Sequence, residues 1–170
     1  MPPMTRRTLL AGLAALASPA LAQPVPAFSS VSVDVGHLKT IGVGPIADLV
    51  RDAMTDELRR IFAGRTGGRG PRLVVRVTTL HLTAFANAGR GLRGPASDSI
   101  EGEALVVGAG GEVLARFPQI ASQIAHGAWS DPEAERRRAE RVARTYAQWL
   151  PRTISLPPSR HPRSAPAARP

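Results

Sequence analysis

Acidic side chains gather at one point of the sequence, where an apolar run begins. Asp98, Glu101 and Glu103 lie within six positions, and Glu101 and Glu103 share a face if the run is a strand. Paired carboxylates can perform acid-base chemistry when their surroundings separate their pKa values. Together with His81 they define one hypothesis, a periplasmic hydrolase. The simpler interpretation is a solvated strand surface.

Arginine side chains gather near the end of the chain, in a segment with helical periodicity. The segment follows Ser130 and Glu133, whose spacing is typical of a helix start. An arginine-lined helix face can bind lipid phosphates or an acidic envelope protein. A solvated, ion-paired helix face is the alternative, because Glu135 and Glu140 dilute the charge. The predicted binding residues are Trp129, Arg136, Arg137, Arg138, Arg141 and Arg144.

Sequence motifs of known catalytic sites do not occur in the chain. There is no Gly-x-Ser-x-Gly, no His-Glu-x-x-His and no Gly-x-Gly-x-x-Gly that opens a helix, as dinucleotide binding requires. The absence of cysteine excludes disulfides, thiolate metal sites and cysteine nucleophiles. The four histidines are scattered without metal-ligand spacing, and aromatic residues are only 4% of the chain. We therefore expect no cofactor, no metal and no enzymatic activity.

The first 22 residues predict export from the cytoplasm. Arg6 and Arg7 precede the apolar stretch Leu9–Ala17, and Ala20–Ala22 has the small-x-small form that a signal peptidase cleaves. The apolar stretch is too short to span a membrane, which takes about 20 residues. We expect cleavage near Ala22 and a periplasmic or secreted protein whose mature chain has no transmembrane span.

Residues Thr5–Leu10 of this signal resemble the bacterial twin-arginine motif, in which paired arginines precede an apolar pair. That resemblance implies that the protein crosses the membrane already folded. A general secretory signal can also carry two adjacent arginines, so both routes stay open. The missing cysteine also removes the lipid acceptor that a bacterial lipoprotein carries at its cleavage site.

The rest of the chain predicts one domain, residues 23–156, followed by a tail. Residues 157–170 consist mainly of Pro, Ala, Ser and Arg without apolar periodicity, which is typical of disorder. Without signal and tail the net charge is about +4. Nucleic-acid binding would need a more concentrated basic stripe, so we expect no nucleic-acid partner.

Apolar periodicity predicts the first half of this domain. Residues 31–35 alternate apolar and polar side chains, as in a half-buried strand. Residues 45–62 repeat apolar side chains every three or four positions, as in a helix that ends at Gly64. Residues 72–85 are apolar on both faces and predict a central strand. His81 falls in line with the valines of that strand.

The second half is predicted as a hairpin and a helix. Residues 100–107 and 112–117 form the hairpin around a glycine-rich turn. Residues 118–129 are irregular but apolar, as in a flap packed over the sheet or the lip of a groove. A helix then runs from Ser130 to Leu150, where Pro151 ends it. The order β-α-β-β-β-α predicts an α+β fold, with a four-stranded, mostly antiparallel sheet and two helices on one face.

Two segments, Arg72–Val77 and Glu101–Val107, together with this layout and the export signal, resemble small bacterial envelope auxiliary proteins. These are the lipopolysaccharide-assembly and ABC-transport auxiliary lipoproteins. The resemblance covers about 120 residues and implies an accessory role in the cell envelope. The chain departs from that group in lacking the lipidated cysteine, and no functional residue carries over. The leading hypothesis is an exported, non-enzymatic binding or accessory protein.

Overall fold

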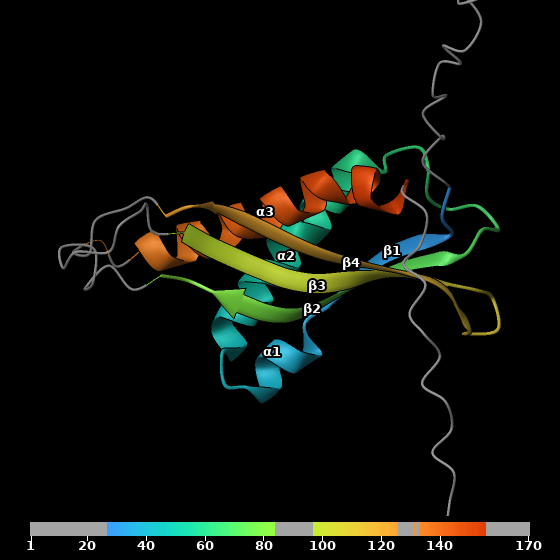
Figure 1. The fold of residues 1–170 in the computed structure, drawn as a ribbon. Helices are drawn as coiled ribbons and strands as arrows, with labels where there is room; N and C mark the ends of the chain where they lie inside the picture. Colours follow the sequence, from blue (N-terminus) through green and yellow to red (C-terminus); the bar gives the residue numbers. More distant parts are fainter. Residues whose placement is uncertain (1–26, 84–96, 126–130, 132, 156–170) are drawn as a thin grey trace, which may run out of the picture.

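The computed structural model describes residues 27–83, 97–125, 131 and 133–155 (Figure 1). The predicted signal and the predicted tail lie outside the described residues. Within the described residues the chain forms four strands and three helices. In chain order these are β1 Ser30–Asp34, α1 Gly36–Thr40, α2 Gly44–Ile61, β2 Arg72–His81, β3 Ser97–Val107, β4 Val113–Ile124 and α3 Ala134–Ile154.

The strands of the described chain form one sheet in the order β1-β2-β3-β4. β1 and β2 run parallel, because the chain passes through α2 before it returns to the sheet. β2 pairs antiparallel with β3, and β3 pairs antiparallel with β4. This mixed, mostly antiparallel sheet confirms the predicted α+β class.

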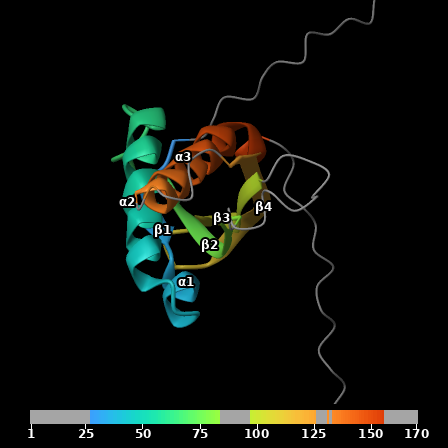
Figure 2. The ribbon, with the colours of Figure 1, turned by 90° about the vertical axis from the view of Figure 1, so that its left-hand side faces the viewer.

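Both long helices lie on one side of the sheet, where α2 and α3 also contact each other (Figures 1 and 2). We call this side the helix-covered face and the opposite side the outer face. The core lies between the helices and the sheet and includes Tyr146, Phe62 and Leu58. Phe28, just before β1, meets the Phe62 ring edge to face at 5.6 Å between centroids, and so fixes the end of α2 against the sheet edge.

The turns around α2 and within the β3–β4 hairpin agree with the sequence prediction. Gly64 has a φ of 73°, a left-handed conformation that ends the helix at little cost for glycine. In the hairpin, Gly111 has a φ of 87° and donates its N–H to the carbonyl of Gly108 at 3.1 Å. Glycine is therefore needed at both positions for conformational reasons.

A bulge in β2 reverses the side-chain direction halfway along the strand. Val77 pairs with Gly102 and Thr79 with Glu101, so Thr78 is the extra residue, and its hydroxyl donates to the Glu101 carbonyl. Before the bulge Val77 faces the helices, whereas beyond it Leu80 does. The prediction that His81 lines up with the valines of β2 is wrong, because the bulge shifts the alternation by one residue.

β4 is longer than the sequence predicts. Residues 118–124 are not irregular but continue the ladder with β3 as far as Ile124. The usual pattern, with apolar side chains inward and polar side chains outward, is reversed at two neighbouring positions: polar Gln119 faces the core and apolar Ile120 faces outward. The inward Gln119 donates from Nε2 to the carbonyl of Tyr146 at 2.7 Å, which satisfies its amide nitrogen. The segment is a strand and not a flap, and its apolar side chains lie on the outer face.

α3 continues past the proline that was expected to end it. Pro151 lies inside the helix, which runs to Ile154. A proline in a helix removes one backbone hydrogen bond and normally bends or ends it. Here Leu150 and Ile154 are both buried in the core, so packing holds the last turn in place. The predicted end at Leu150 is therefore wrong.

Candidate functional site

The arginines predicted as binding residues on α3 fall into two groups in the structure. The exposed ones are Arg136, Arg137, Arg141 and Arg144, whereas Arg138 is buried. Arg137, Arg141 and Arg144 are spaced by four and three residues, which places them on one side of the helix. We call these three residues the arginine face. Trp129, predicted to lie beside them, is outside the described residues.

Exposed arginines of α3 take part in local ion pairs. These pairs are Arg136 with Glu133 at 3.4 Å, Arg137 with Asp131, and Arg144 with Glu140 at 3.4 Å. Within the described residues, the Arg141 guanidinium forms no ion pair or hydrogen bond, whereas the Arg141 carbonyl accepts from the Thr145 hydroxyl at 3.0 Å. Exposed pairs of this kind contribute only about 0–1 kcal/mol, so a phosphate or carboxylate can replace the acidic partner at little cost. The arginine face is therefore available to a ligand, although the neighbouring acidic side chains partly neutralise its positive charge.

Arg138 does not belong to the exposed face, which corrects the sequence prediction. Only 3% of it is exposed, and it lies against Asp98, which is fully buried. The Arg138 Nε donates to Asp98 Oδ2 at 2.8 Å, and its Nη2 bonds Asp98 Oδ1 and the Thr83 carbonyl. Asp98 Oδ1 also accepts the backbone N–H of Thr83 at 3.1 Å. This buried ion pair ties α3 to the ends of β2 and β3.

The helical position of Arg138 explains its burial. It lies four residues after Ala134 and four before Val142, and both of these face the core. In the same way Asp98 lies two residues before Ile100, on the helix-covered face of β3. These two spacings were readable in the sequence. Only the fold, however, brings two residues 40 positions apart into contact.

The carboxylates of the alternative hydrolase site do not converge. Asp98 faces α3, whereas Glu101 and Glu103 lie on the outer face, because residues alternate along β3. His81 pairs with Ser99 near the end of β2 and is exposed. His81, Glu101 and Glu103 therefore lie on the same face of the sheet, and Asp98 lies on the opposite face. The arrangement does not assemble the four-residue site that the sequence predicted.

Glu103 belongs instead to a row of charges that crosses the outer face. Its carboxylate accepts from Arg76 on β2 at 3.3 Å and from Arg116 on β4 at 3.2 Å. Arg76 also contacts Asp34 on β1 at 3.3 Å. The four residues come from four successive strands, and we call them the ionic ladder. Sequence reasoning missed it because strand register decides which charges meet.

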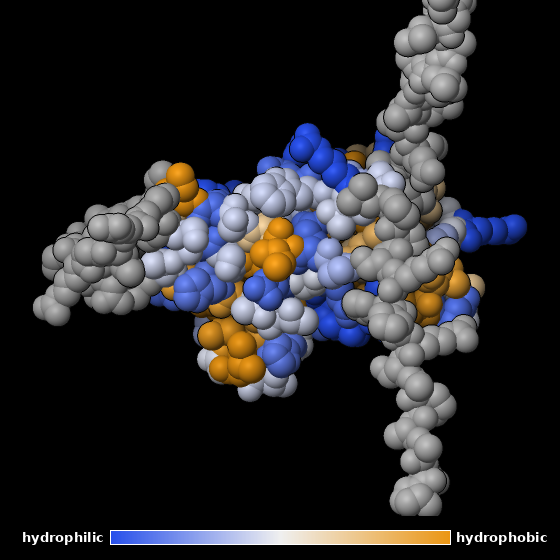
Figure 3. Space-filling view, viewed as in Figure 1, coloured by the Kyte–Doolittle hydropathy of each residue, from blue (hydrophilic) through white to orange (hydrophobic). Residues whose placement is uncertain are grey.

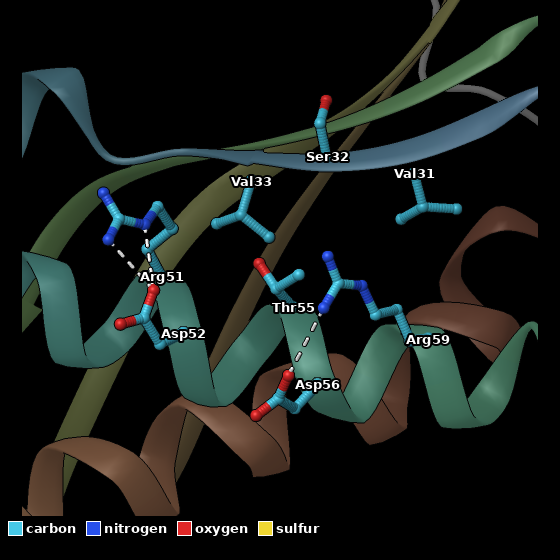
Figure 4. Close-up of a pocket in the computed structure, with 8 residues that line it drawn as sticks. All are labelled: Val31, Ser32, Val33, Arg51, Asp52, Thr55, Asp56 and Arg59. Atoms are coloured by element: carbon cyan, nitrogen blue, oxygen red, sulfur yellow. Dashed lines mark hydrogen bonds and ion pairs between the residues drawn. The ribbon is translucent and has the colours of Figure 1, made fainter.

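A groove of about 600 Å³ runs between the edge strand β1 and α2 (Figure 4). Val31 and Val33 point into it from the strand, whereas Ser32 points away. Its charged groups pair along α2: Arg51 with Asp52, and Arg59 with Asp56, as the dashed lines in Figure 4 mark. Because two arginines and two aspartates line the groove, it presents no net charge to a ligand.

Tyr146 and Glu57 both have shifted pKa values. Burial raises the pKa of Tyr146, and the nearby Glu103 charge adds to the effect. The Tyr146 hydroxyl has no hydrogen-bond partner among the described residues. It packs against β3 at Gly102, where an added Cβ would collide with the Arg76 carbonyl. On α2, a hydrogen bond from Arg60 lowers the pKa of Glu57.

The described residues contain no group of three or more His, Cys, Asp or Glu side chains placed to hold a metal ion. Among those same residues, no helix is both long enough and apolar enough to cross a membrane.

Fold and site together define an α+β protein with an arginine-bearing surface helix. Among solved structures, the chain is similar to a candidate lipoprotein of Caulobacter crescentus, with 15% identity and a TM-score of 0.42 over 75% of this chain and 87% of that one. It is also similar to a minor lipoprotein of Acinetobacter baumannii, with 13% identity and a TM-score of 0.44 over 78% and 98% of the two chains. No protein-family profile matches the sequence. No curated protein matches it either.

Proposed function

We propose that this chain is an exported, non-enzymatic accessory protein of the bacterial cell envelope, which binds an anionic lipid surface through the arginine face of α3. The observation that carries the proposal is the placement of Arg137, Arg141 and Arg144 on one exposed side of a helix. The opposite side of that helix is buried in the core, so the three guanidinium groups extend from a rigid element. An acidic envelope protein is the alternative ligand.

The chemistry of arginine favours phosphate as the bound group. A guanidinium offers a planar fork of donors that matches a phosphate in two places at once. Each basic residue near an anionic membrane adds about 1 kcal/mol of attraction, which salt screens. Three such residues give on the order of 100-fold in affinity. Arg141 supports phosphate binding because, in the described part of the chain, its guanidinium has no acidic partner that a phosphate would have to displace.

Vesicle binding tests the proposal directly. The exported chain is mixed with phosphatidylcholine vesicles that contain or lack anionic phosphatidylglycerol, and bound protein is measured by co-sedimentation at two salt concentrations. We expect binding only to the anionic vesicles and a loss of at least about 100-fold in the variant Arg137→Glu/Arg141→Glu/Arg144→Glu, because each change removes an attraction and adds a repulsion.

A matched control reverses the same number of charges elsewhere. Arg65, Arg69 and Arg72 are exposed and lie outside α3, so their change to Glu alters the net charge equally. If both triple variants lose binding to the same degree, net charge and not the arginine face is responsible. If the chain does not bind anionic vesicles but binds an acidic envelope protein through the same three residues, the proposal that it binds lipid is wrong.

Export is tested separately, because the signal is part of the proposal. The full chain is expressed with a periplasmic reporter, and Arg6 and Arg7 are both changed to Lys. Twin-arginine export requires the arginine pair, so retention of the variant in the cytoplasm would favour that route, whereas unchanged export would favour the general secretory route. Cytoplasmic retention of the unaltered chain would contradict the envelope location.

A further inference from the structure

Trp149 is the exposed aromatic residue of α3. Its exposed fraction is 44%, although Leu150 beside it and Tyr146 one turn earlier are fully buried. Tryptophan joins a large apolar ring to a polar N–H, which suits it to a surface that is apolar on one side and wet on the other. Trp149 is the only aromatic side chain among the large apolar residues that are strongly exposed in the described chain. The others are Ile41 and, on β4, Val113, Leu114, Ile120 and Ile124.

The exposed apolar residues do not merge into one wide patch on the side of the molecule that Figure 3 draws, where orange areas are separated by blue and white ones. A wide apolar patch marks a surface that buries a large area against a protein partner. A lipid surface needs less, because a single tryptophan ring can sit at the headgroup level of a membrane. The exposure of one ring on α3 therefore fits a bilayer better than a protein.

Trp149 lies beside the arginine face, on the side of α3 that borders β4. Thr145 and Trp149 are four residues apart and so share one side of the helix. The Thr145 hydroxyl donates to Gln123 Oε1 on β4 at 3.3 Å, which identifies that side. Arg152, three residues after Trp149, is exposed and forms no ion pair within the described residues. The ring is thus next to exposed guanidinium groups.

The other side of the arginine face borders α2 and is acidic. A hollow of about 150 Å³ lies there between the two helices, and its charged lining is Asp52, Asp56, Glu140 and Arg144. Arg51 and Arg59, which pair with the two aspartates, line the groove beside β1 instead. Three carboxylates against one guanidinium repel an anionic surface from this side. An anionic surface can approach α3 more closely from the side that carries Trp149.

We propose that Trp149 enters the headgroup region of an anionic bilayer beside the arginine face, so that α3 lies on the membrane along the side that borders β4. This inference rests on the proposed function, because it describes how the same helix contacts lipid. The guanidinium groups pair with lipid phosphates, and the indole ring leaves water at the boundary of the acyl chains. The acidic side of α3 then faces away from the membrane.

Tryptophan fluorescence tests the inference. The chain has two tryptophans, so Trp129→Phe leaves Trp149 as the only indole. This variant is mixed with vesicles of phosphatidylcholine and phosphatidylglycerol, in which some phosphatidylcholine carries a quencher either near the headgroup or at the end of an acyl chain. We expect the emission to shift to shorter wavelength. The label near the headgroup should quench more strongly than the label at the chain end, because the ring stays shallow.

A matched control places the indole elsewhere. Ile41 is 56% exposed and lies on α1, at the bottom of both ribbon views, whereas α3 lies at the top (Figures 1 and 2). The control is Ile41→Trp in a chain that also carries Trp129→Phe and Trp149→Phe. Its emission should show neither the shift nor the quenching, although the arginine face still holds the chain on the vesicle.

Co-sedimentation measures what the ring contributes to binding. Trp149→Ala should weaken binding to the anionic vesicles by about 10-fold, because the exposed part of the ring no longer leaves water. Ile41→Ala should leave binding unchanged. High salt should weaken the binding of the natural chain and leave the 10-fold ratio nearly the same, since apolar burial is not screened. Circular dichroism confirms that both variants fold.

The outcomes separate this inference from the proposed function. If the chain binds anionic vesicles, but the Trp149 emission does not shift and Trp149→Ala binds as tightly as the natural chain, the inference fails and the proposed function stands. If the chain does not bind anionic vesicles, both fail. Equal quenching of the control indole at position 41, or the same emission shift with inorganic phosphate alone, would also overturn the inference.

Discussion

The two faces of the sheet carry ion pairs of opposite character. On the helix-covered face, Arg138 and Asp98 meet in the core with almost no exposed surface. On the outer face, the ionic ladder, which includes Arg76 and Glu103, remains in contact with water. The residues are of the same kinds, although the buried pair is closer, with 2.8 Å between Arg138 Nε and Asp98 Oδ2 against 3.2–3.3 Å in the ladder. Their surroundings decide most of what each pair contributes to stability.

Desolvation is the physical reason for this difference. A charge in the core has lost its hydration, so each member of the buried pair depends on the other and on the Thr83 backbone, whose N–H donates to Asp98 and whose carbonyl accepts from Arg138. A charge of the ladder that loses its partner is hydrated again at once. Removing one partner should therefore lower the free energy of unfolding strongly on the helix-covered face and only slightly on the outer face.

The largest effect is expected from Arg138→Met, which keeps the side-chain length and leaves Asp98 buried without its cation. We expect a loss of about 3–5 kcal/mol in the free energy of unfolding, measured by urea denaturation. Arg141→Met on the same helix is the control and should change stability by less than about 0.5 kcal/mol. Equal losses in both variants would contradict the distinction between buried and exposed arginines.

The double variant Asp98→Leu/Arg138→Met tests whether desolvation is the cause. With both charges gone, no group is left buried and unpaired, so the double variant should recover most of the loss, to within about 1 kcal/mol of the natural chain. Urea denaturation of the two single variants and the double variant gives the coupling energy. If the losses of the single variants simply add, the pair is not coupled as the structure implies.

Tyr146 extends the comparison to a buried polar group that has no partner among the described residues. Tyr146→Phe removes the unpaired hydroxyl and should raise stability by about 1 kcal/mol at neutral pH. Because the folded-state pKa of Tyr146 is raised, its stability contribution is complete below the unfolded pKa, about 10, and is lost as the pH rises beyond it.

Denaturation between neutral and strongly alkaline pH measures that loss. Tyr146 is the only tyrosine, so its ionisation can be followed by absorbance without overlap. The Phe variant should lack the alkaline loss of stability that comes from this residue. Ionisation of Tyr146 at the ordinary pH in the folded chain would contradict its burial.

The smallest effect is expected on the outer face. Glu103→Gln removes the shared carboxylate of the ladder and should cost at most about 1 kcal/mol. High salt should reduce even that difference, whereas it should leave the Arg138→Met loss almost unchanged, because buried pairs are screened little. The measurement is urea denaturation at low and high salt. A cost for Glu103→Gln as large as that for Arg138→Met would remove the contrast between the faces.

Much of the fold was predictable, because apolar periodicity records which side of an element is buried. The valines of β1, the apolar stripe of α2 and the glycine turn of the hairpin all appear where the pattern placed them. The predictions that are wrong, those for residues 118–124 and for Pro151, concern local signals that packing overrides. An inward Gln119 and a buried Ile154 have their partners elsewhere in the chain.

The candidate site was only partly predictable for the same reason. Helical periodicity correctly placed Arg136, Arg137, Arg141 and Arg144 on the exposed side of α3, but it placed Arg138 there as well. It could not show that Arg138 turns toward Asp98, since the sequence does not state which acid lies behind the helix. Likewise, one bulged residue moved His81 to the other side of β2. Prediction of the site fails where a shift by one residue moves a side chain to the other face of its strand or helix.

The sequence by itself determined the order of the four strands and the two long helices and the α+β class, because these follow from local periodicity and from the turn-forming residues; the short helix α1 was not predicted. Tertiary structure alone decided which charges are buried, which cross the outer face in the ionic ladder, and which apolar residues stay exposed on β4. These outcomes depend on strand register and on helix packing against the sheet. Both bring together residues that are far apart in the chain, which then contact one another instead of water.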